Sequence, residues 1–287
     1  MEKINRSKPY KKEVLEHLHR VQIEMIQDLD RVCKKYEIPY FAAFGTALGA
    51  VRHQGFIPWD DDTDVGMLRK DYDRFLEIAE KELGDHYRIL TPEVDKRYAC
   101  NVTKLQRKGT VFISHLSKNL KCEQCIFIDI FPFDCVAPTK KLAKRQWFMT
   151  TFLDRLLYLC GTPYPVIPYK GIKFALAQSI CWCTHYGLKL FHVSPRFIYR
   201  LYVKACTKYN PMHTKYVTSF GDAESMQYKF PVKNMFPVEE VPFEDISICV
   251  LRNNKEHLEN AYGNYMELPP EDKRINHSPY VIKFEDE

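Results

Sequence analysis

Residues 56–67, with the sequence FIPWDDDTDVGM, place four carboxylates in five positions between a Pro-Trp pair and an apolar segment. If Asp62 to Met67 is extended, successive side chains point to opposite faces of the strand. Asp62 and Asp64 then project to one face, roughly 6–7 Å apart along the strand, and Asp61 projects to the other. Two carboxylates at this spacing can share a hard divalent cation.

Two other uses of an acidic segment compete with this interpretation. A calcium loop of the EF-hand type that begins at Asp60 needs Gly at its sixth position and Glu at its twelfth, but these positions hold Val65 and Asp71. The second alternative is that the acids cap the following helix or lie on a solvated turn, which is the usual location of acidic segments. Helix capping needs only one acid, and apolar residues flank this cluster closely, so the pattern favours a metal site.

The composition indicates a compact protein with a large core, because 45% of the 287 residues are hydrophobic and only 11 are Gly. The net charge of +5 comes from 42 basic and 37 acidic residues. This excess suits anionic substrates or an anionic membrane surface, but it is too small to indicate nucleic acid as a partner.

The ten cysteines are scattered along the chain, and its first twelve residues contain no apolar core of a signal peptide. This pattern predicts free thiols in a reducing cytoplasm. Cys122 and Cys125 are the one pair with the spacing of metal ligands. Zinc remains an alternative there only if residues such as Cys100 and Cys135 approach in space, because a structural zinc site needs about four ligands.

Periodicity predicts an α+β fold. Apolar residues at spacings of three and four predict helices at 10–36, after Asp71 as the capping residue, at 142–159, at 172–193 and near 252–262, where Gly263 ends the helix. Short apolar segments predict strands at 40–44, 62–67, 87–90, 100–106, 111–115 and 126–131, with a small helix at 47–51. Pro132 and Pro138 mark the exit from this core. We expect a catalytic core over 1–138 and a mainly helical part over 139–287 that completes the same unit.

The segment 172–193 is strongly apolar but includes Gln178, Ser179, Thr184, His185 and two lysines. Its longest uncharged stretch is shorter than the roughly 20 residues that a membrane span requires. The pattern therefore predicts a helix that is buried or lies on a membrane surface, as a peripheral contact.

Two further features accompany the acidic segment. Asp129 is the one acid in an otherwise apolar strand, where a buried carboxylate is costly unless it meets a cation. Gly45 and Thr46 are expected to form a tight turn after the strand at 40–44, and small residues there allow backbone N–H groups to approach a phosphate. With Asp62 and Asp64, these features predict a nucleotide-phosphate site holding one or two Mg²⁺ ions. Their order is that of the nucleotidyltransferase superfamily, whose mixed sheet is flanked by helices.

The segment Tyr40–Phe75, YFAAFGTALGAVRHQGFIPWDDDTDVGMLRKDYDRF, closely resembles the LicD family of phosphotransferases, whose relatives include fukutin and the fukutin-related protein. The resemblance continues in residues 104–110, in IDIFPFD at Ile128–Asp134 and in YGNYMELPPEDKR at Tyr262–Arg274. Residues 142–212 are the least similar to the family.

This resemblance implies transfer of a phosphorylated alcohol from a CDP-linked donor to a sugar hydroxyl, with release of CMP. Phosphocholine is the expected group, and ribitol or glycerol phosphate is the alternative. The expected acceptor is an oligosaccharide or lipid-linked precursor of a cell-surface glycan such as lipopolysaccharide or teichoic acid. By position, Asp62, Asp64 and Asp129 are implied as catalytic residues that bind Mg²⁺ or Mn²⁺, with Asp60 as a further ligand.

Other residues in the similar segments are candidates for substrate binding, together with Gly45 and Thr46. Three cations are candidate phosphate partners: Arg52, Lys104 and Arg274. Trp59 has two possible roles: its ring covers a choline ammonium or a base by a cation–π contact, or it packs in the core. The core is favoured, because one aromatic ring does not form a cage. His53 and His277 lie in the same segments, where packing or capping is the alternative to catalysis.

Two other functions are compatible with the same residues. A true nucleotidyltransferase would attach a nucleotide to its acceptor and release pyrophosphate, and a non-catalytic scaffold would keep only the fold. The intact acids at 62, 64 and 129 argue against a scaffold. The absence of an N-terminal anchor in the sequence leads us to expect an enzyme in the cytoplasm or at the inner face of the membrane.

Overall fold

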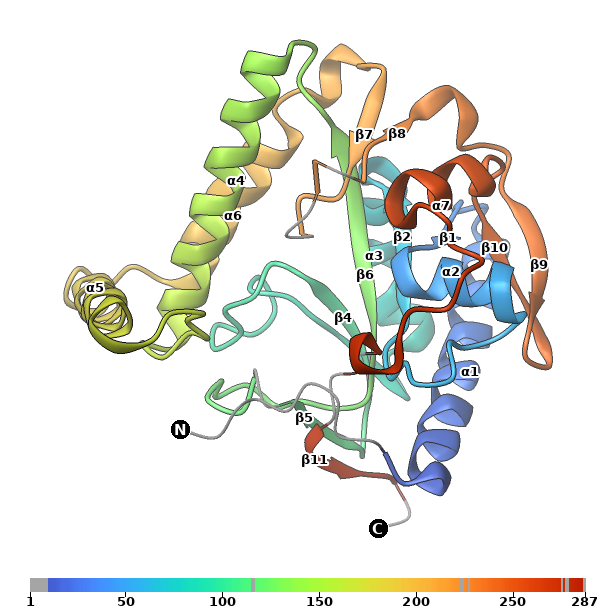
Figure 1. Ribbon diagram of the computed structural model, residues 1–287, viewed down its shortest axis with the longest axis horizontal. Helices are drawn as coiled ribbons and strands as arrows, with labels where there is room; N and C mark the ends of the chain where they lie inside the picture. Colours follow the sequence, from blue (N-terminus) through green and yellow to red (C-terminus); the bar gives the residue numbers. More distant parts are fainter. Residues whose placement is uncertain are drawn as a thin grey trace.

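A curled sheet flanked by helices forms the centre of the molecule (Figure 1). The computed structural model describes residues 10–114, 117–221, 225–226, 228–274, 276 and 279–285, and in this part of the chain the sheet has seven strands. Five of them follow the order β1 (Phe41–Ala42), β2 (Asp64–Leu68), β6 (Phe127–Cys135), β4 (Thr103–Arg107) and β3 (Tyr87–Leu90). Strand β7 (Tyr216–Thr218) pairs with the end of β6, and β8 (Phe230–Pro231) pairs with β7. The predicted α+β class with a mixed sheet is confirmed.

The register of three neighbouring strands aligns the acids that the sequence analysis selected. Strands β2 and β6 are parallel, with Asp64 opposite Asp129. Strand β4 is antiparallel to β6, with Lys104 opposite Asp129. Because directly opposed residues project to the same face of a sheet, these three side chains form one row across β2, β6 and β4.

Helices α1 (Lys12–Lys35) and α3 (Arg69–Leu83) pack against each other and against β6. The stripe predicted for the first helix is confirmed, since Leu18, Met25 and Leu29 are all fully buried. Helix α3 buries Phe75 in the same core. Helix α2 (Phe44–His53) lies beside the start of β2 and connects the core to the acidic segment.

Two predicted boundaries near the site were wrong. Gly45 and Thr46 do not form a turn before a small helix, because α2 already begins at Phe44 and includes both residues in its first turn. Asp71 does not cap α3, because the helix already begins at Arg69. Its N-cap position is Leu68, whose side chain makes no capping hydrogen bond. Both differences arise because the chain turns directly from strand into helix, without the polar capping residue that a sequence pattern relies on.

Two strand boundaries also differ. Strand β2 begins at Asp64 instead of Asp62, although the Thr63 carbonyl still accepts a hydrogen bond from Asp129 N–H at 2.9 Å. Strand β6 does not end before Pro132 but continues to Cys135. Proline is tolerated there because β4 pairs with β6 only as far as Ile130, so the missing N–H falls beyond that ladder.

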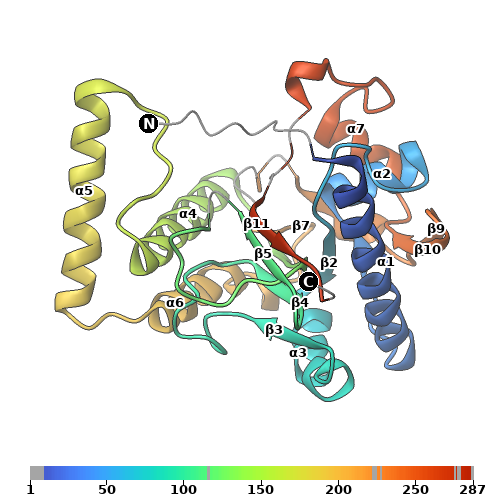
Figure 2. The same cartoon turned by 90° about the horizontal axis from the view of Figure 1, so that it is seen from below.

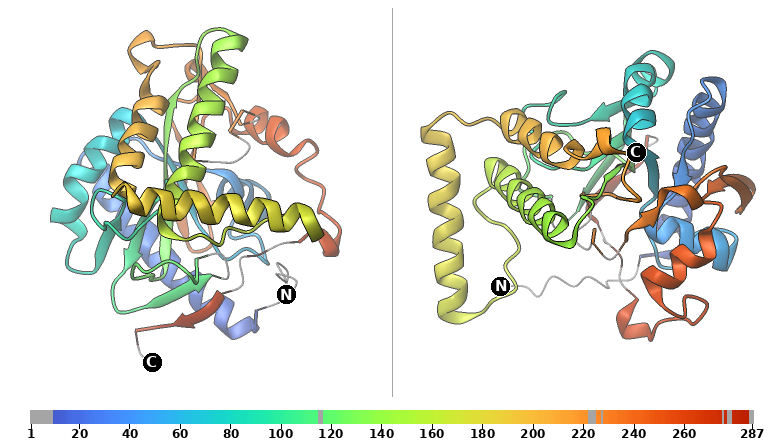
Figure 3. Two further views of the ribbon diagram at one scale, coloured as in Figure 1. Left: turned by 90° about the vertical axis from the view of Figure 1, so that its left-hand side faces the viewer. Right: turned by 90° about the horizontal axis from the view of Figure 1, so that it is seen from above.

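The second half of the chain contributes several helices, as predicted. They are α4 (Lys140–Gly161), α5 (Gly171–Leu190), α6 (Pro195–Thr207) and α7 (Asn254–Tyr262), the last ending at Gly263. Helices α4 and α6 pack side by side, and α5 crosses their ends, away from the sheet (Figures 2 and 3). Among the described residues, no helix has the length and apolarity that a membrane crossing requires.

The second half also contains strands that the sequence analysis did not resolve. Strands β9 (Glu239–Phe243) and β10 (Ile246–Val250) form a hairpin, and β11 (Pro279–Lys283) pairs with β5 (Val111–Ser114). Short 3₁₀ turns occupy Asn210–Met212, Val232–Asn234 and Glu271–Lys273. Strand β7 thus brings the second half into the central sheet, while the division at residue 138 stays a prediction.

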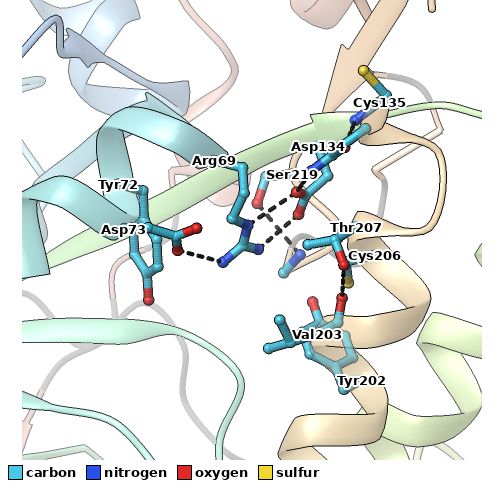
Figure 4. Close-up of polar contacts among 12 residues, drawn as sticks. Arg69, Tyr72, Asp73, Asp134, Cys135, Tyr202, Val203, Cys206, Thr207 and Ser219 are labelled. Atoms are coloured by element: carbon cyan, nitrogen blue, oxygen red, sulfur yellow. Dashed lines mark hydrogen bonds and ion pairs between the residues drawn. The ribbon is translucent and has the colours of Figure 1, made fainter. Parts of the chain in front are cut away.

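A buried ion pair fixes the far end of β6 to the start of α3 (Figure 4). The Arg69 guanidinium donates from Nε to Asp134 Oδ1 at 3.0 Å and from Nη2 to Asp134 Oδ2 at 2.7 Å. Asn210 Nδ2 donates to the same Oδ1 at 2.7 Å. Burial opposes the charge of Arg69, but Asp134 raises the pKa of the guanidinium above its ordinary value. Asp134 follows Asp129 by five strand residues, about 17 Å, so this pair supports the fold at a distance from the acidic row.

Candidate active site

The acidic row lies at the start of β2 and early in β6. The carboxylate of Asp64 is almost completely buried, whereas Asp129 is partly exposed. Lys104 Nζ donates to Asp129 Oδ1 at 2.6 Å and also lies 3.2 Å from the centroid of the Phe127 ring. The lysine predicted to contact a phosphate therefore contacts an acid of the row, and its role toward a substrate stays a prediction.

Asp60, Asp61 and Asp62 precede β2 and differ in their surroundings. Asp61 is buried, and its Oδ2 accepts a hydrogen bond from Tyr10 Oη at 2.6 Å, while its carbonyl accepts one from Gln22. Asp60 and Asp62 are partly exposed. This separation agrees with the predicted alternation, in which Asp61 faces away from Asp62 and Asp64. Asp61 thus anchors the acidic segment to α1.

The electrostatics of Asp64 show that the acids form one group. Burial raises the pKa of the Asp64 carboxyl well above its ordinary range, and the charges of Asp62, Asp129 and Asp60 raise it further, in that order. Lys104 opposes this shift. Three carboxylates are therefore close enough to Asp64 to disfavour its charge, which is costly unless a cation joins them.

The first turn of α2 completes one side of the group. Thr46 Oγ1 accepts a hydrogen bond from the Asp64 backbone N–H at 2.8 Å, so the threonine sets the position of β2 relative to the helix. A Cβ atom on Gly45 would lie 2.8 Å from Asp60 Oδ2, so glycine allows this carboxylate to lie against the helix backbone. No side chain caps α2 at Ala43, and the Asp60 carboxylate lies against the first turn, where the positive end of the helix dipole favours a negative charge.

A cavity of about 550 Å³ adjoins Asp60. Its lining comes from α2, from the acidic segment and from the part of the chain around residues 262–273, and includes Arg52, Trp59 and Tyr265. Arg52 Nη1 donates to the Tyr265 carbonyl at 2.8 Å. The structure thus brings two predicted substrate-binding residues to one cavity and adds the aromatic segment at 262–265. Only the family-like sequence of that segment pointed to it.

Trp59 and Arg274 contact each other. The guanidinium carbon of Arg274 lies 4.7 Å from the Trp59 ring centroid, and its Nε donates to the Pro269 carbonyl at 3.2 Å. Trp59 is partly buried and packs against the core, as favoured. Its ring also contacts the Arg274 guanidinium, which attaches the segment at 269–274 to the acidic segment.

Of the candidate histidines and cysteines, those that the structure describes make few contacts with the acidic row or with the cavity beside Asp60. His53 Nε2 accepts a hydrogen bond from Arg52 Nε at 3.0 Å, which is a local positioning contact, and His277 lies outside the described residues. Cys100, Cys122 and Cys125 line one small cavity near Lys104. Burial raises the pKa of Cys125 to about 11 and that of Cys100 to about 12, so these thiols stay protonated at neutral pH.

The acidic row and the segment before it offer only carboxylate oxygens as metal ligands. Among the described residues, no three His, Cys, Asp or Glu side chains are arranged so that they could hold a metal ion. The oxygen-only donors and the mutual repulsion at Asp64 nevertheless suit a hard divalent cation such as Mg²⁺.

A mixed sheet with neighbouring acids on two parallel strands, beside the start of a helix that begins Phe-Gly-Thr, defines a nucleotidyltransferase-like domain. Residues 37–155 match the LicD/FKTN/FKRP nucleotidyltransferase domain, so the chain carries a domain of this family. The chain is also similar to a lipopolysaccharide cholinephosphotransferase, LicD, of Haemophilus influenzae, with 27% identity over 93% of this chain and 97% of that protein. An uncharacterized protein of Rickettsia prowazekii is 35% identical over 33% of this chain and 34% of its own length. An uncharacterized protein of Rickettsia typhi is 44% identical over 33% of this chain and 29% of its own length.

Proposed function

We propose that this LicD-family transferase moves phosphocholine from CDP-choline to a sugar hydroxyl of a cell-surface glycan precursor and releases CMP. The observation that carries the proposal is the row of Asp64 and Asp129 on adjacent parallel strands, with Asp60 and Asp62 close enough to shift the pKa of Asp64. The similarity to a lipopolysaccharide cholinephosphotransferase over nearly the full chain supports the choice of phosphocholine and of a lipopolysaccharide-like acceptor.

In the proposed reaction, the acceptor hydroxyl oxygen attacks the phosphorus that carries choline. A new P–O bond forms to the sugar, the anhydride P–O bond breaks, and its electron pair leaves with CMP. The hydroxyl proton passes to a carboxylate of the row. Asp129, held by Lys104 at 2.6 Å, is placed either to accept this proton or to act as a ligand.

Asp60, Asp62, Asp64 and Asp129 are the residues that would hold Mg²⁺ or Mn²⁺. When bound, such an ion would neutralise the phosphate charge that builds up on the leaving CMP. The α2 backbone at Gly45 would approach the diphosphate, and the helix dipole would favour its negative charge. Arg52 and Trp59 would contact the donor in the cavity beside Asp60, with Arg274 stacked on the tryptophan.

The experiment is incubation of the full chain with Mg²⁺, a glycan acceptor lacking phosphocholine, and one of three donors: CDP-choline, CDP-ribitol or CDP-glycerol. Release of CMP and a mass gain of the acceptor with CDP-choline support the proposal. The same products with only a polyol donor would assign ribitol or glycerol phosphate as the group transferred. Release of pyrophosphate from CTP, with nucleotide attached to the acceptor, would support the nucleotidyltransferase alternative.

The proposed location follows from the acceptor. A lipid-linked glycan precursor would be met at the inner face of the membrane by an enzyme of the cytoplasm, and no nucleic acid partner is involved.

A further inference from the structure

Helix α5 directs its apolar side chains away from the protein. Ile172, Leu176, Ile180 and Leu190 are 81%, 61%, 66% and 73% exposed. At 100° per residue these four positions fall within a sector of about 80°. A helix on the surface of a water-soluble domain normally shows the opposite arrangement, with its apolar stripe facing the core. We refer to these four residues as the α5 stripe.

The opposite side of α5 attaches it to the rest of the chain. His185 is buried, and its Nδ1 lies 2.6 Å from the Leu159 carbonyl oxygen at the end of α4. Gln178 Nε2 donates to the Pro163 carbonyl at 2.6 Å. These polar contacts fix the helix about its own axis, so the stripe is held outward. Figure 2 shows α5 lying across the ends of α4 and α6, at the far side from the sheet.

The sequence on both sides of α5 carries charge of one sign. From residue 155 to residue 221 the sequence contains nine Lys and Arg residues and no Asp or Glu. Two of them, Arg196 and Arg200, contact Glu93 on the loop after β3. Lys170, Lys173 and Lys189 are exposed at the two ends of α5. An apolar stripe with lysines at its ends matches an anionic lipid surface. The aliphatic part of each lysine side chain can lie along the acyl region while its ammonium group reaches the lipid headgroups.

Aromatic residues at the side of the helix strengthen the match. Trp182 is 48% exposed and packs on Tyr186 with ring centroids 4.3 Å apart. Lys189 Nζ lies 5.6 Å from the Tyr186 ring centroid. Trp and Tyr favour the boundary between headgroups and acyl chains, where a ring is half apolar and half wet.

From these observations we infer that α5 docks the protein on an anionic membrane surface, with the α5 stripe inserted among the lipids and the lysines on the headgroups. The helix lies in the plane of the surface, consistent with its failure to meet the requirements of a span. This inference rests on α5 and its neighbours and not on the proposed reaction, so either can fail without the other.

The test is sedimentation of the full chain with vesicles of phosphatidylglycerol and phosphatidylcholine in equal amounts, and with vesicles of phosphatidylcholine alone. We expect binding to the anionic vesicles that weakens strongly in about 1 M salt, where charges are screened beyond about 3 Å. Leu176→Gln combined with Ile180→Gln should weaken binding about tenfold or more. Lys170→Gln combined with Lys173→Gln should weaken it about tenfold or more on anionic vesicles only.

Matched controls and a spectroscopic signal separate docking from unfolding. Val94→Gln, at a 67% exposed position outside α5, and Lys255→Gln, at a 77% exposed side chain in α7, should leave binding unchanged. Binding should also move the fluorescence emission to shorter wavelength, and Trp182→Phe should remove most of that shift. All variants change exposed residues, so their thermal midpoints should equal that of the wild type.

Two results would overturn the inference. The first is a lack of the expected binding: the wild-type protein stays in the supernatant with anionic vesicles, or Leu176→Gln with Ile180→Gln binds the vesicles as well as the wild type does. The second is a concentration-dependent dimer in gel filtration that Leu176→Gln with Ile180→Gln dissociates, without membrane binding, which would show that the stripe pairs with a second copy of this chain.

Discussion

Replacing Asp134 by Asn should destabilise the protein strongly, because it removes the buried counter-charge of Arg69 and leaves only Asp73, a 59% exposed carboxylate at 3.7 Å. The side chains of Arg69 and Asp134 are only 12% and 1% exposed, so water cannot replace the lost partner. The carboxylate accepts two hydrogen bonds from Arg69 and one from Asn210. Removing one partner of such a buried pair typically costs about 3–5 kcal/mol of unfolding free energy.

The assay is urea unfolding followed by circular dichroism, for Asp134→Asn and for the double variant Arg69→Met with Asp134→Leu. The double variant removes both charges and should recover much of the loss, because an apolar pair of similar volume is close to neutral in such sites. Asp95→Asn is the matched control, since Arg97 Nη2 contacts Asp95 Oδ2 at 3.0 Å but the arginine is 62% exposed. Its unfolding midpoint should stay near that of the wild type. A loss for Asp134→Asn smaller than about 1 kcal/mol, or equal to that of Asp95→Asn, would refute the reasoning.

Three further predictions concern single side chains. Thr46→Val should cost about 1–3 kcal/mol of unfolding free energy, because it leaves the buried Asp64 N–H without its hydrogen-bond acceptor. Thr46→Ser keeps the hydroxyl and should not have this cost. Equal midpoints for the two variants in urea would contradict this prediction. Gly45→Ala should reduce transfer activity with little change in thermal midpoint, since its Cβ displaces the Asp60 carboxylate, and full activity in a steady-state assay would exclude that contact as important. Burial lowers the pKa of His257 to about 4. As the pH falls, the unfolded chain therefore takes up this proton before the folded protein does, and stability falls as the pH drops from 6.5 toward 4. Between pH 7 and 5 the wild type should lose about 2 kcal/mol more unfolding free energy than His257→Gln, as measured by urea unfolding at each pH.

The row of acids was largely predictable from the sequence, because its information is local. Strand period places Asp62 and Asp64 on one face, and an acid in an apolar strand singles out Asp129. The register that brings Asp64 and Lys104 opposite Asp129, one from each side, depends on pairing between residues 65 and 25 positions apart in the chain. Sequence period cannot specify that pairing, so the contact between Lys104 and Asp129 was found only in the structure.

Other differences have equally specific physical causes. The start of α2 at Phe44 was missed because its N-cap position is Ala43, which has no polar side chain to mark a helix start. Strand β6 was ended too early at Pro132 because the tolerance of proline there depends on which neighbours pair with that strand. The segments least similar to the family contain α5, where period alone identified the helix but not which side of it faces outward.

The most direct test of the account is CMP release from CDP-choline by the wild type, Asp64→Asn, Asp129→Asn and the exposed control Asp245→Asn, each with Mg²⁺ and a glycan acceptor lacking phosphocholine. We predict CMP from the wild type and the control, and a loss of about a hundredfold or more in the two row variants, with thermal midpoints showing that they remain folded. Unchanged CMP release in folded Asp64→Asn and Asp129→Asn, or no CMP from the wild type with any CDP-alcohol, would contradict the assignment of this row as the centre of a phosphotransferase.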